Sequence, residues 1–493
     1  MFYRSLILLI LCGFSILTSA AEVPIYDFPL KAYSQDVNAY LSPDSADYTT
    51  SLLKPAYQQA QLRQFYNHYY STAERGLSPW SAQMVNAVLP VVKQIQFDTV
   101  NDYDNQNQPD DKKHYGMNFK EHDGNWLQQI KRNMNWAAIE SISFNPQNRA
   151  IAVTNTFARA LPEQAPDFYH FSLAGQGFPF DNLEESAVWA GTPLYVLSVS
   201  QDKSWSLVLT PDEYFAWVKS SDIAYVSNQF IVQWQKAAQA GLIAITETGT
   251  SVVNKHQHFQ FTGYIGAVFP LVARDDNQIT ILTPAKNAWH QAVITRSFVN
   301  ANAAVLMPLE ASPKNMARII KQLQNRPYGW GGMFFFNDCS QELKSIFTPL
   351  GIWLPRNSGH QAKMGTPQDL SKKSMDERIT ALKEKGHPLM TLVYIGGHVM
   401  LYLGNKTVSE HEQVAMTYQN IWGMSPENKE SRYVIGQSVF FPLLKYYPEI
   451  PGSGSLANSS YFTLVHLDEL DEMSSPAEFI RDFTKPSRPD LSL

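Results

Sequence analysis

The sequence predicts a multidomain protein in which a helical N-terminal region precedes two small β-rich barrels and an α+β domain. Its 493 residues are too many for one hydrophobic core and suggest about three or four domains. Short β-rich runs separated by turn residues fill the middle of the chain, and apolar residues at helical spacing occur on both sides of them. This order of patterns indicates separate folding units arranged along the chain.

Residues 1–20 have the pattern of a secretory signal peptide. A short positive start at Arg4 is followed by an apolar stretch from Leu6 to Leu17 and by small residues from Thr18 to Ala21. Cys12 follows a bulky residue, so lipidation is not expected. No later stretch is long and apolar enough for a membrane span. We therefore expect an exported protein that is periplasmic, associated with the cell envelope, or secreted.

The overall composition excludes one large class of partners. The net charge is -6, the isoelectric point is about 6.1, and no run of Lys and Arg occurs, so nucleic acid is not an expected partner. Aromatic residues make up 13% of the chain and charged residues only 17%. Such a surface suits carbohydrate or peptide partners better.

Residues 21–150 are expected to be mainly helical. Ser78-Pro79 is typical of a helix start, with the serine as N-cap and the proline at the first helical position. Apolar residues then recur at Met84, Val88 and Val91. This pattern predicts one long helix with a buried face.

Two sets of short strands follow, in predicted domains of residues 151–228 and 229–305. Each set predicts a small barrel or sandwich because its strands are short and turn residues separate them. The clearest runs are residues 194–199, 204–209 and 215–218 in the first set, and 241–245 and 278–282 in the second.

The α+β domain is predicted to span residues 306–445. It opens with Ser312-Pro313, another N-cap and proline pair, ahead of apolar residues at helical spacing. The remaining residues, 446–493, are rich in proline and glycine and read as a C-terminal tail. A short apolar run within that tail, from Tyr461 to Leu467, is expected to pack against the body.

Cys339 is the candidate nucleophile. After removal of the predicted signal peptide it is the one cysteine left, in an oxidising compartment and without a disulfide partner. It follows the Gly-rich turn 328–332 and precedes a run with helical apolar spacing. A helix N-terminus favours the thiolate, which predicts a thiol pKa below about 8.5, and its N–H groups can hold an oxyanion. The alternative is an inert buried thiol, which the Gly-rich turn and the flanking Asp338 and Ser340 disfavour.

His398 is the candidate base for this thiol. It lies between two predicted strands that are joined at Gly396-Gly397. A third group should accept the other imidazole N–H and fix the tautomer, and the candidates are His411, Gln419 and Asn420. The predicted strand 414–420 could hold Gln419 beside His398, where its side-chain oxygen would accept the N–H.

Several short motifs together resemble the NlpC-type cell-wall cysteine peptidases. The resemblance covers about residues 312–444 and rests on Tyr328-Gly329-Trp330-Gly331-Gly332, Asp338-Cys339-Ser340, Leu354-Pro355-Arg356-Asn357-Ser358 and Gly397-His398. The segments 177–181 and 191–193 also resemble a multidomain branch of this family with two SH3-like domains. The resemblance implies a papain-like catalytic domain that needs no metal or organic cofactor. It further implies hydrolysis of the γ-D-glutamyl bond to a diamino acid in peptidoglycan stem peptides or muropeptides.

The same resemblance assigns substrate-binding residues. In related enzymes the residues matching Asp338 and Tyr328 hold the free amino group of an L-alanine, and Trp330 and Ser340 complete the two motifs. The first SH3-like domain of relatives adds an acidic residue that cannot be placed in this sequence, and Thr192 stands near the expected position. Arg356 is expected to pair with a carboxylate in a structural role.

Two departures from the family pattern keep an alternative open. Gln341 stands where the family usually has glycine, so the first helical turn is bulkier. Gln419 stands where the third catalytic residue is often histidine, and an amide can orient an imidazole but cannot share its charge. The alternative is therefore a catalytically weakened cell-wall-binding protein with SH3-like modules. Acyl transfer to an acceptor other than water would use the same residues.

Overall fold

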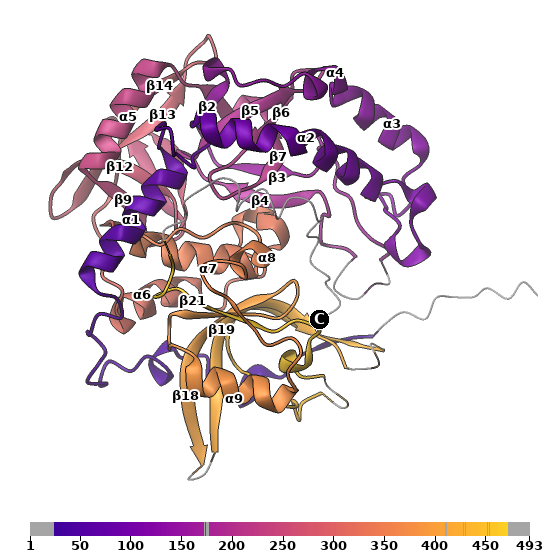
Figure 1. The fold of residues 1–493 in the computed structure, drawn as a ribbon, viewed down its shortest axis with the longest axis vertical. Helices are drawn as coiled ribbons and strands as arrows, with labels where there is room; N and C mark the ends of the chain where they lie inside the picture. Colours follow the sequence, from indigo (N-terminus) through magenta and orange to yellow (C-terminus); the bar gives the residue numbers. More distant parts are fainter. Residues whose placement is uncertain are drawn as a thin grey trace, which may run out of the picture.

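The computed structural model describes residues 24–471, apart from residues 172, 174–176, 410–411, 427, 429, 451 and 453. The predicted signal peptide and the last part of the predicted tail lie outside the described residues. Within them, three seven-stranded sheets form the cores of three units, with a helical region packed alongside (Figure 1). Of the described helices, none combines the length and apolar composition that a bilayer crossing requires.

The N-terminal region is mainly helical, as predicted. Its elements are β1 (Ile25–Asp27), α1 (Pro55–Tyr69), α2 (Ala82–Asp102), α3 (Gly124–Asn133), α4 (Trp136–Glu140) and short 3-10 turns at 30–32, 37–39, 105–107, 110–112 and 146–148. The predicted start of the long helix at Ser78 is wrong by several residues. Ser78 instead caps a preceding turn, and Ser81 is the N-cap of α2 because its side chain accepts from the Met84 N–H. Val92, rather than the predicted Val91, takes the buried position.

The first β-rich unit has seven strands in the order β4-β3-β7-β6-β5-β2-β8. They are β2 (Arg149–Ala152), β3 (Thr156–Arg159), β4 (Glu184–Val188), β5 (Pro193–Val199), β6 (Trp205–Leu209), β7 (Phe215–Lys219) and β8 (Ile223–Tyr225), with a 3-10 turn at 220–222. Helix α2 packs on this sheet, where Val88 and Val92 share a core with Leu207 and Trp217. The Trp217 indole donates to the Gln96 side chain at 2.9 Å, so its one polar atom is satisfied inside this core.

The second β-rich unit begins with α5 (Asn228–Ala240) and repeats the architecture. Its strands are β9 (Leu242–Ile245), β10 (Thr250–Asn254), β11 (Phe259–Gly263), β12 (Val268–Arg274), β13 (Gln278–Lys286), β14 (Ala292–Asn300) and β15 (Ala304–Leu306), in the order β11-β10-β14-β13-β12-β9-β15. All five strand runs predicted from the sequence lie in strands of these two units. The multidomain fold class is confirmed.

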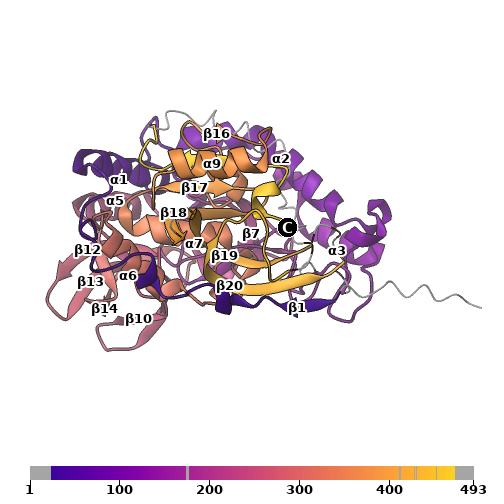
Figure 2. The same cartoon turned by 90° about the horizontal axis from the view of Figure 1, so that it is seen from below.

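The third unit is an α+β domain whose sheet lies between two layers of helices (Figures 1 and 2). Helices α6 and α7 pack on one face and α9 on the other. The helical elements are α6 (Pro313–Leu323), α7 (Cys339–Phe347), α8 (Ser358–Gln361), α9 (Met375–Lys385) and 3-10 turns at 330–335 (η7), 348–350 and 456–458. The strands are β16 (Gln368–Asp369), β17 (Thr391–Tyr394), β18 (Val399–Ser409), β19 (Glu412–Met424), β20 (Arg432–Pro442) and β21 (Thr463–His466).

This sheet includes strands from both sides of the predicted span 306–445. Its order is β1-β20-β19-β18-β17-β21-β16, with β1 parallel to β20 and β21 antiparallel to β17. Figure 2 shows β1 running beside β20 at one edge. The apolar run from Tyr461 to Leu467 therefore packs against the body, as predicted, and it does so within the sheet.

The first β-rich unit packs directly against the α+β domain. The Trp353 indole donates to the Pro211 carbonyl at 3.0 Å, and Lys344 forms an ion pair with Asp212 at 2.8 Å. The turn η7 lies on β4 so closely that a Cβ at Gly331 would be 2.2 Å from a backbone oxygen of β4. Gly331 also has a positive φ of 56°, so both space and backbone conformation call for glycine in this turn.

Candidate active site

Cys339 begins helix α7, as predicted from the sequence. Asp338 is the N-cap, and its Oδ1 accepts from the Gln341 N–H at 3.0 Å. The thiol is buried, with Cys339 6% exposed. It lies 4.0 Å from the Gly397 carbonyl oxygen and accepts a hydrogen bond from the Val399 N–H. The two backbone groups that flank His398 therefore both contact the candidate nucleophile.

His398 is buried between β17 and β18, and its Nε2 lies 2.7 Å from Gln419 Oε1. An amide oxygen only accepts, so Nε2 carries the proton and Nδ1 keeps a free lone pair. The Gln419 amide is itself oriented, because its Nε2 donates to Thr417 Oγ1 at 3.0 Å. The pairing of β18 with β19, with Leu401 opposite Tyr418, produces this arrangement. Of the two candidates that the structure describes, Gln419 is the one that hydrogen-bonds the imidazole.

The other two candidates for the third group have different positions. Asn420 points away from the imidazole and donates to the Asn337 carbonyl at 2.7 Å. His411 lies outside the described residues. Within the part of the chain that the structure describes, Gln419 is the side chain that hydrogen-bonds His398.

Burial controls the protonation of both reacting groups. It raises the pKa of the Cys339 thiol to about 12, and the Asp338 carboxylate acts in the same direction. The N–H groups of Val399 and Ser340 lower this pKa but are outweighed, so the expectation of a depressed thiol pKa was wrong. Burial also lowers the pKa of His398 to about 4. At neutral pH the resting pair is a thiol and a neutral imidazole that can take its proton.

This protonation state can be tested by alkylation. The rate of reaction of Cys339 with iodoacetamide is expected to rise about tenfold per pH unit from pH 7 to 10, because only the thiolate reacts and its fraction keeps rising below a pKa of about 12. The same protein unfolded in urea provides the control, in which the rate should level off above about pH 8.5. A plateau near pH 8 in the folded protein would contradict the raised pKa.

The four residues assigned to substrate binding gather around Cys339. Burial raises the pKa of the Tyr328 phenol, and the nearby Cys339 and Asp338 add to this effect, so the phenol stays neutral. The rings of Tyr328 and Trp330 lie 6.0 and 6.2 Å from that of Phe180, a buried residue of the first β-rich unit. That unit therefore supplies part of the wall beside the candidate nucleophile.

Asp338 is held by a buried arginine. The Arg356 guanidinium binds both of its carboxylate oxygens, at 2.6 and 3.1 Å, and donates to Ser340 Oγ at 2.9 Å. Its Nε donates to Ser186 Oγ on β4 at 2.8 Å. The predicted pairing of Arg356 with a carboxylate is confirmed. Asp338 is thus both the cap of α7 and one half of an ion pair at the domain interface.

Family comparisons agree with this geometry. Residues 325–428 match the model of the NlpC/P60 family, residues 166–219 that of an SH3 domain of SH3b1 type, and residues 227–276 that of an SH3 domain of SH3b2 type. The chain carries an NlpC/P60 domain. This domain follows two SH3b-type domains, which correspond to the two β-rich units.

Individual relatives extend the likeness beyond the NlpC/P60 domain. A solved structure of a novel NlpC/P60 endopeptidase from Photobacterium damselae subsp. piscicida is 28% identical, with a TM-score of 0.74 over 89% of this chain and 98% of that one. A curated γ-D-glutamyl-L-lysine dipeptidyl-peptidase of Bacillus subtilis (strain 168) is 30% identical over 141 residues. That match covers 27% of this chain and 44% of the relative, so the chain spans less than half of that relative's length.

The sequence did not predict the acidic residues that the structure places near the site. On β4 of the SH3b1-type domain, Glu185 accepts from the Tyr214 hydroxyl, and Arg356 lies close enough to influence that phenol electrostatically. Thr192, the position suggested by the sequence, lies instead in the turn between β4 and β5, where its carbonyl accepts from Ala152. The sequence of a short strand such as β4 cannot reveal which residue faces a neighbouring domain.

Glu342 was also missed. It is fully buried in α7, and its carboxylate accepts from Tyr418, Ser438 and Asn337, each at 2.7 Å. These bonds connect the helix of the nucleophile with β19 and β20 of the NlpC/P60 sheet. Little in the sequence signals its burial, because Ser340, Gln341 and Lys344 around it are also polar.

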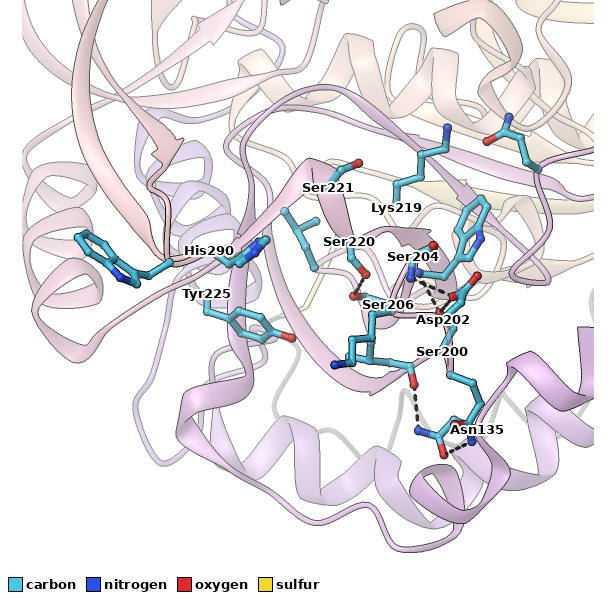
Figure 3. Close-up of a pocket in the computed structure, with 17 residues that line it drawn as sticks. Asn135, Ser200, Asp202, Ser204, Ser206, Lys219, Ser220, Ser221, Tyr225 and His290 are labelled. Carbon is cyan, nitrogen blue, oxygen red and sulfur yellow. Dashed lines mark hydrogen bonds between the residues drawn. The ribbon is translucent and has the colours of Figure 1, made fainter.

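A broad groove elsewhere on the protein holds none of these residues. It has a volume of about 1150 Å³ and lies between the SH3b1-type domain, the N-terminal helices and a loop of the SH3b2-type domain. Figure 3 shows Ser200, Asp202 and Ser206 on one side of it, with Tyr225 and His290 on the other.

Proposed function

We propose that this protein is a cysteine peptidase that hydrolyses the γ-D-glutamyl bond to the diamino acid in peptidoglycan stem peptides or muropeptides. NlpC/P60 proteins are a family of cysteine peptidases that act on the cell wall. The observation that carries the proposal is the contact of the Cys339 thiol with the backbone next to His398, whose imidazole is oriented by Gln419. The bond specificity is supported by the name of the Bacillus subtilis relative.

In the proposed mechanism, His398 Nδ1 takes the proton of Cys339 as the sulfur attacks the amide carbonyl. Backbone N–H groups of Cys339 and Ser340, at the start of α7, stabilise the oxyanion. The C–N bond then breaks, and His398 gives the proton to the leaving amine. Water, deprotonated by His398, hydrolyses the thioester and restores the thiol. Gln419 holds the imidazole in the tautomer that these steps need.

We also propose that the substrate carries a free L-alanine amino group. Asp338 and Tyr328 place carboxylate and phenol groups near Cys339, and Glu185 lies on β4, against which turn η7 packs. A carboxylate binds an ammonium through charge-assisted hydrogen bonds. Trp330 and Phe180 supply an apolar wall. Because the SH3b1-type domain contributes to this wall, short peptides with free ends fit better than intact sacculi. The proposed location is the periplasm or cell envelope, in agreement with the predicted signal peptide.

The proposal is tested by mass spectrometry with L-Ala-γ-D-Glu-diaminopimelate and its N-acetylated form. The unmodified protein is expected to release L-Ala-γ-D-Glu from the free-ended peptide, with at least about a hundredfold lower rate on the acetylated one, because acetylation removes the ammonium group that the carboxylate and phenol oxygens would bind. Cys339→Ala should release nothing from either peptide.

A matched control comes from the same helix. Ser345 is as buried as Cys339, and its hydroxyl has no hydrogen-bond partner among the described residues, so Ser345→Ala should retain activity. Cleavage by Cys339→Ala would reject the assigned nucleophile. No cleavage of either peptide by the unmodified protein would favour the cell-wall-binding alternative.

A further inference from the structure

A second cluster of reactive side chains lies apart from the peptidase site. His387 lies in the loop between α9 and β17, His466 ends β21, and Asp468 follows it. One ligand atom from each of the three residues lies within 4.8 Å of the others. The side chains of His387 and Asp468 are 39% and 24% exposed, so a solvent ion can reach them. The proposed mechanism uses none of these residues.

Hydrogen bonds already hold one nitrogen of each imidazole. His387 Nδ1 lies 2.9 Å from the Asp468 carboxylate, and His466 Nδ1 lies 2.9 Å from Thr391 Oγ1. The two rings stack with their centroids 4.4 Å apart. Metal-binding histidines commonly donate one ring N–H to a carboxylate or similar acceptor while the other nitrogen binds the ion. Here this pattern leaves both Nε2 atoms as ligands and Asp468 as either a third ligand or the orienting group.

The surrounding charges also favour a cation. The carboxylates of Asp468, Glu469 and Asp471 all lie close enough to Tyr57 to help raise its pKa to about 12. Three carboxylates in this small region create a negative potential beside the two imidazoles.

We propose that His387, His466 and Asp468 form a binding site for a divalent transition-metal ion, with zinc as the ion that suits this donor set. Imidazole and carboxylate groups are preferred zinc ligands, at about 2.0–2.2 Å from the ion. Ligand atoms of a tetrahedral zinc are therefore about 3.3 Å apart. Side-chain rotation of these partly exposed groups closes the remaining distance.

The position of the site indicates a structural role. Thr391 and His466 are paired residues of β17 and β21, so an ion bound here would connect the loop before β17 to the turn after β21. Strand β21 comes from the residues after 445 and belongs to the NlpC/P60 sheet. Metal binding would therefore stabilise the attachment of the C-terminal part of the chain to the catalytic domain.

The experiment uses the full-length mature protein with Cys339→Ala, which removes the thiol as a competing zinc ligand. After treatment with EDTA and dialysis, the protein is titrated with zinc chloride by calorimetry, and its melting temperature is measured with and without zinc. We expect one ion per chain with a micromolar or tighter dissociation constant, and a higher melting temperature in zinc. His466→Gln and Asp468→Asn, which keep hydrogen-bonding capacity, should weaken binding at least about tenfold and remove the thermal shift.

His256→Gln provides the matched control. His256 and His258 form another pair of neighbouring imidazoles, with centroids 5.9 Å apart, in the SH3b2-type domain. This variant should bind zinc like its parent. Equal binding by the parent and His466→Gln would overturn the proposed site, as would loss of binding in His256→Gln. Because all measurements are made without the catalytic thiol, the result is independent of whether the peptidase proposal holds.

Discussion

Replacement of His398 by alanine is expected to lower kcat/KM for the γ-D-glutamyl peptide by about 10⁴-fold. The thiol of Cys339, with its pKa raised to about 12, has almost no thiolate at neutral pH. The protein therefore cannot rely on a preformed thiolate, and attack requires a base that takes the proton as the C–S bond forms. His398 is the candidate for that base. Initial rates of dipeptide release, measured by mass spectrometry over several hours, provide the test.

The pH profile gives this prediction a specific signature. Because the pKa of folded His398 is about 4, the imidazole is a free base above that pH, and kcat/KM should fall only as the pH approaches 4. Gln419→Glu is the matched variant, since it keeps the size of the side chain and adds a negative charge 2.7 Å from the imidazole Nε2. A nearby opposite charge favours the imidazolium and should move the acidic limb upward by about 1–2 pH units. An unmodified protein whose activity falls near pH 6.5, or an unshifted limb in Gln419→Glu, would contradict this account.

Local features of the sequence predicted the centre of the site because they act over short distances. The N-cap at Asp338 and the apolar spacing after Cys339 determine where α7 begins, and both are visible within ten residues. His398 directly precedes β18 and Gln419 lies on β19, its antiparallel neighbour, so their proximity follows from the register of these strands. The strand runs of both SH3b-type domains could also be predicted, because short β-rich runs separated by turn residues are local signals in the sequence.

Features that depend on contacts between domains could not be predicted. The pKa of Cys339 is raised chiefly by burial. The neighbouring Tyr328 packs against Phe180, which belongs to another domain. The N-terminal β1 joins β20 although the two are about 400 residues apart, and no periodicity in β1 reports its partner. A helix N-terminus lowers a thiol pKa only where desolvation is modest, and the sequence does not report desolvation.

Arg356→Met is expected to reduce the free energy of unfolding by about 3–5 kcal/mol, measured by urea denaturation, and to abolish peptide cleavage. The substitution leaves the carboxylate of Asp338 without its buried partner, removes the hydrogen bonds to Ser340 and to Ser186 on the SH3b1-type domain, and loosens the start of α7. By contrast, the exposed ion pair of Lys93 and Glu140 provides a control, since Lys93→Met should cost no more than about 1 kcal/mol.

The double variant Asp338→Asn/Arg356→Met separates charge from packing. If the cost of Arg356→Met comes from an unpaired buried carboxylate, neutralising Asp338 should recover much of the lost stability, giving a coupling of about 1–3 kcal/mol. Activity should not return, because Arg356 also orients Ser340 beside the nucleophile and fixes the SH3b1-type domain against α7. Additive losses in the two single variants would mean that the ion pair is weak and that packing alone holds the interface. Recovery of stability without recovery of cleavage would instead show that this arginine positions the catalytic helix as well as stabilising it.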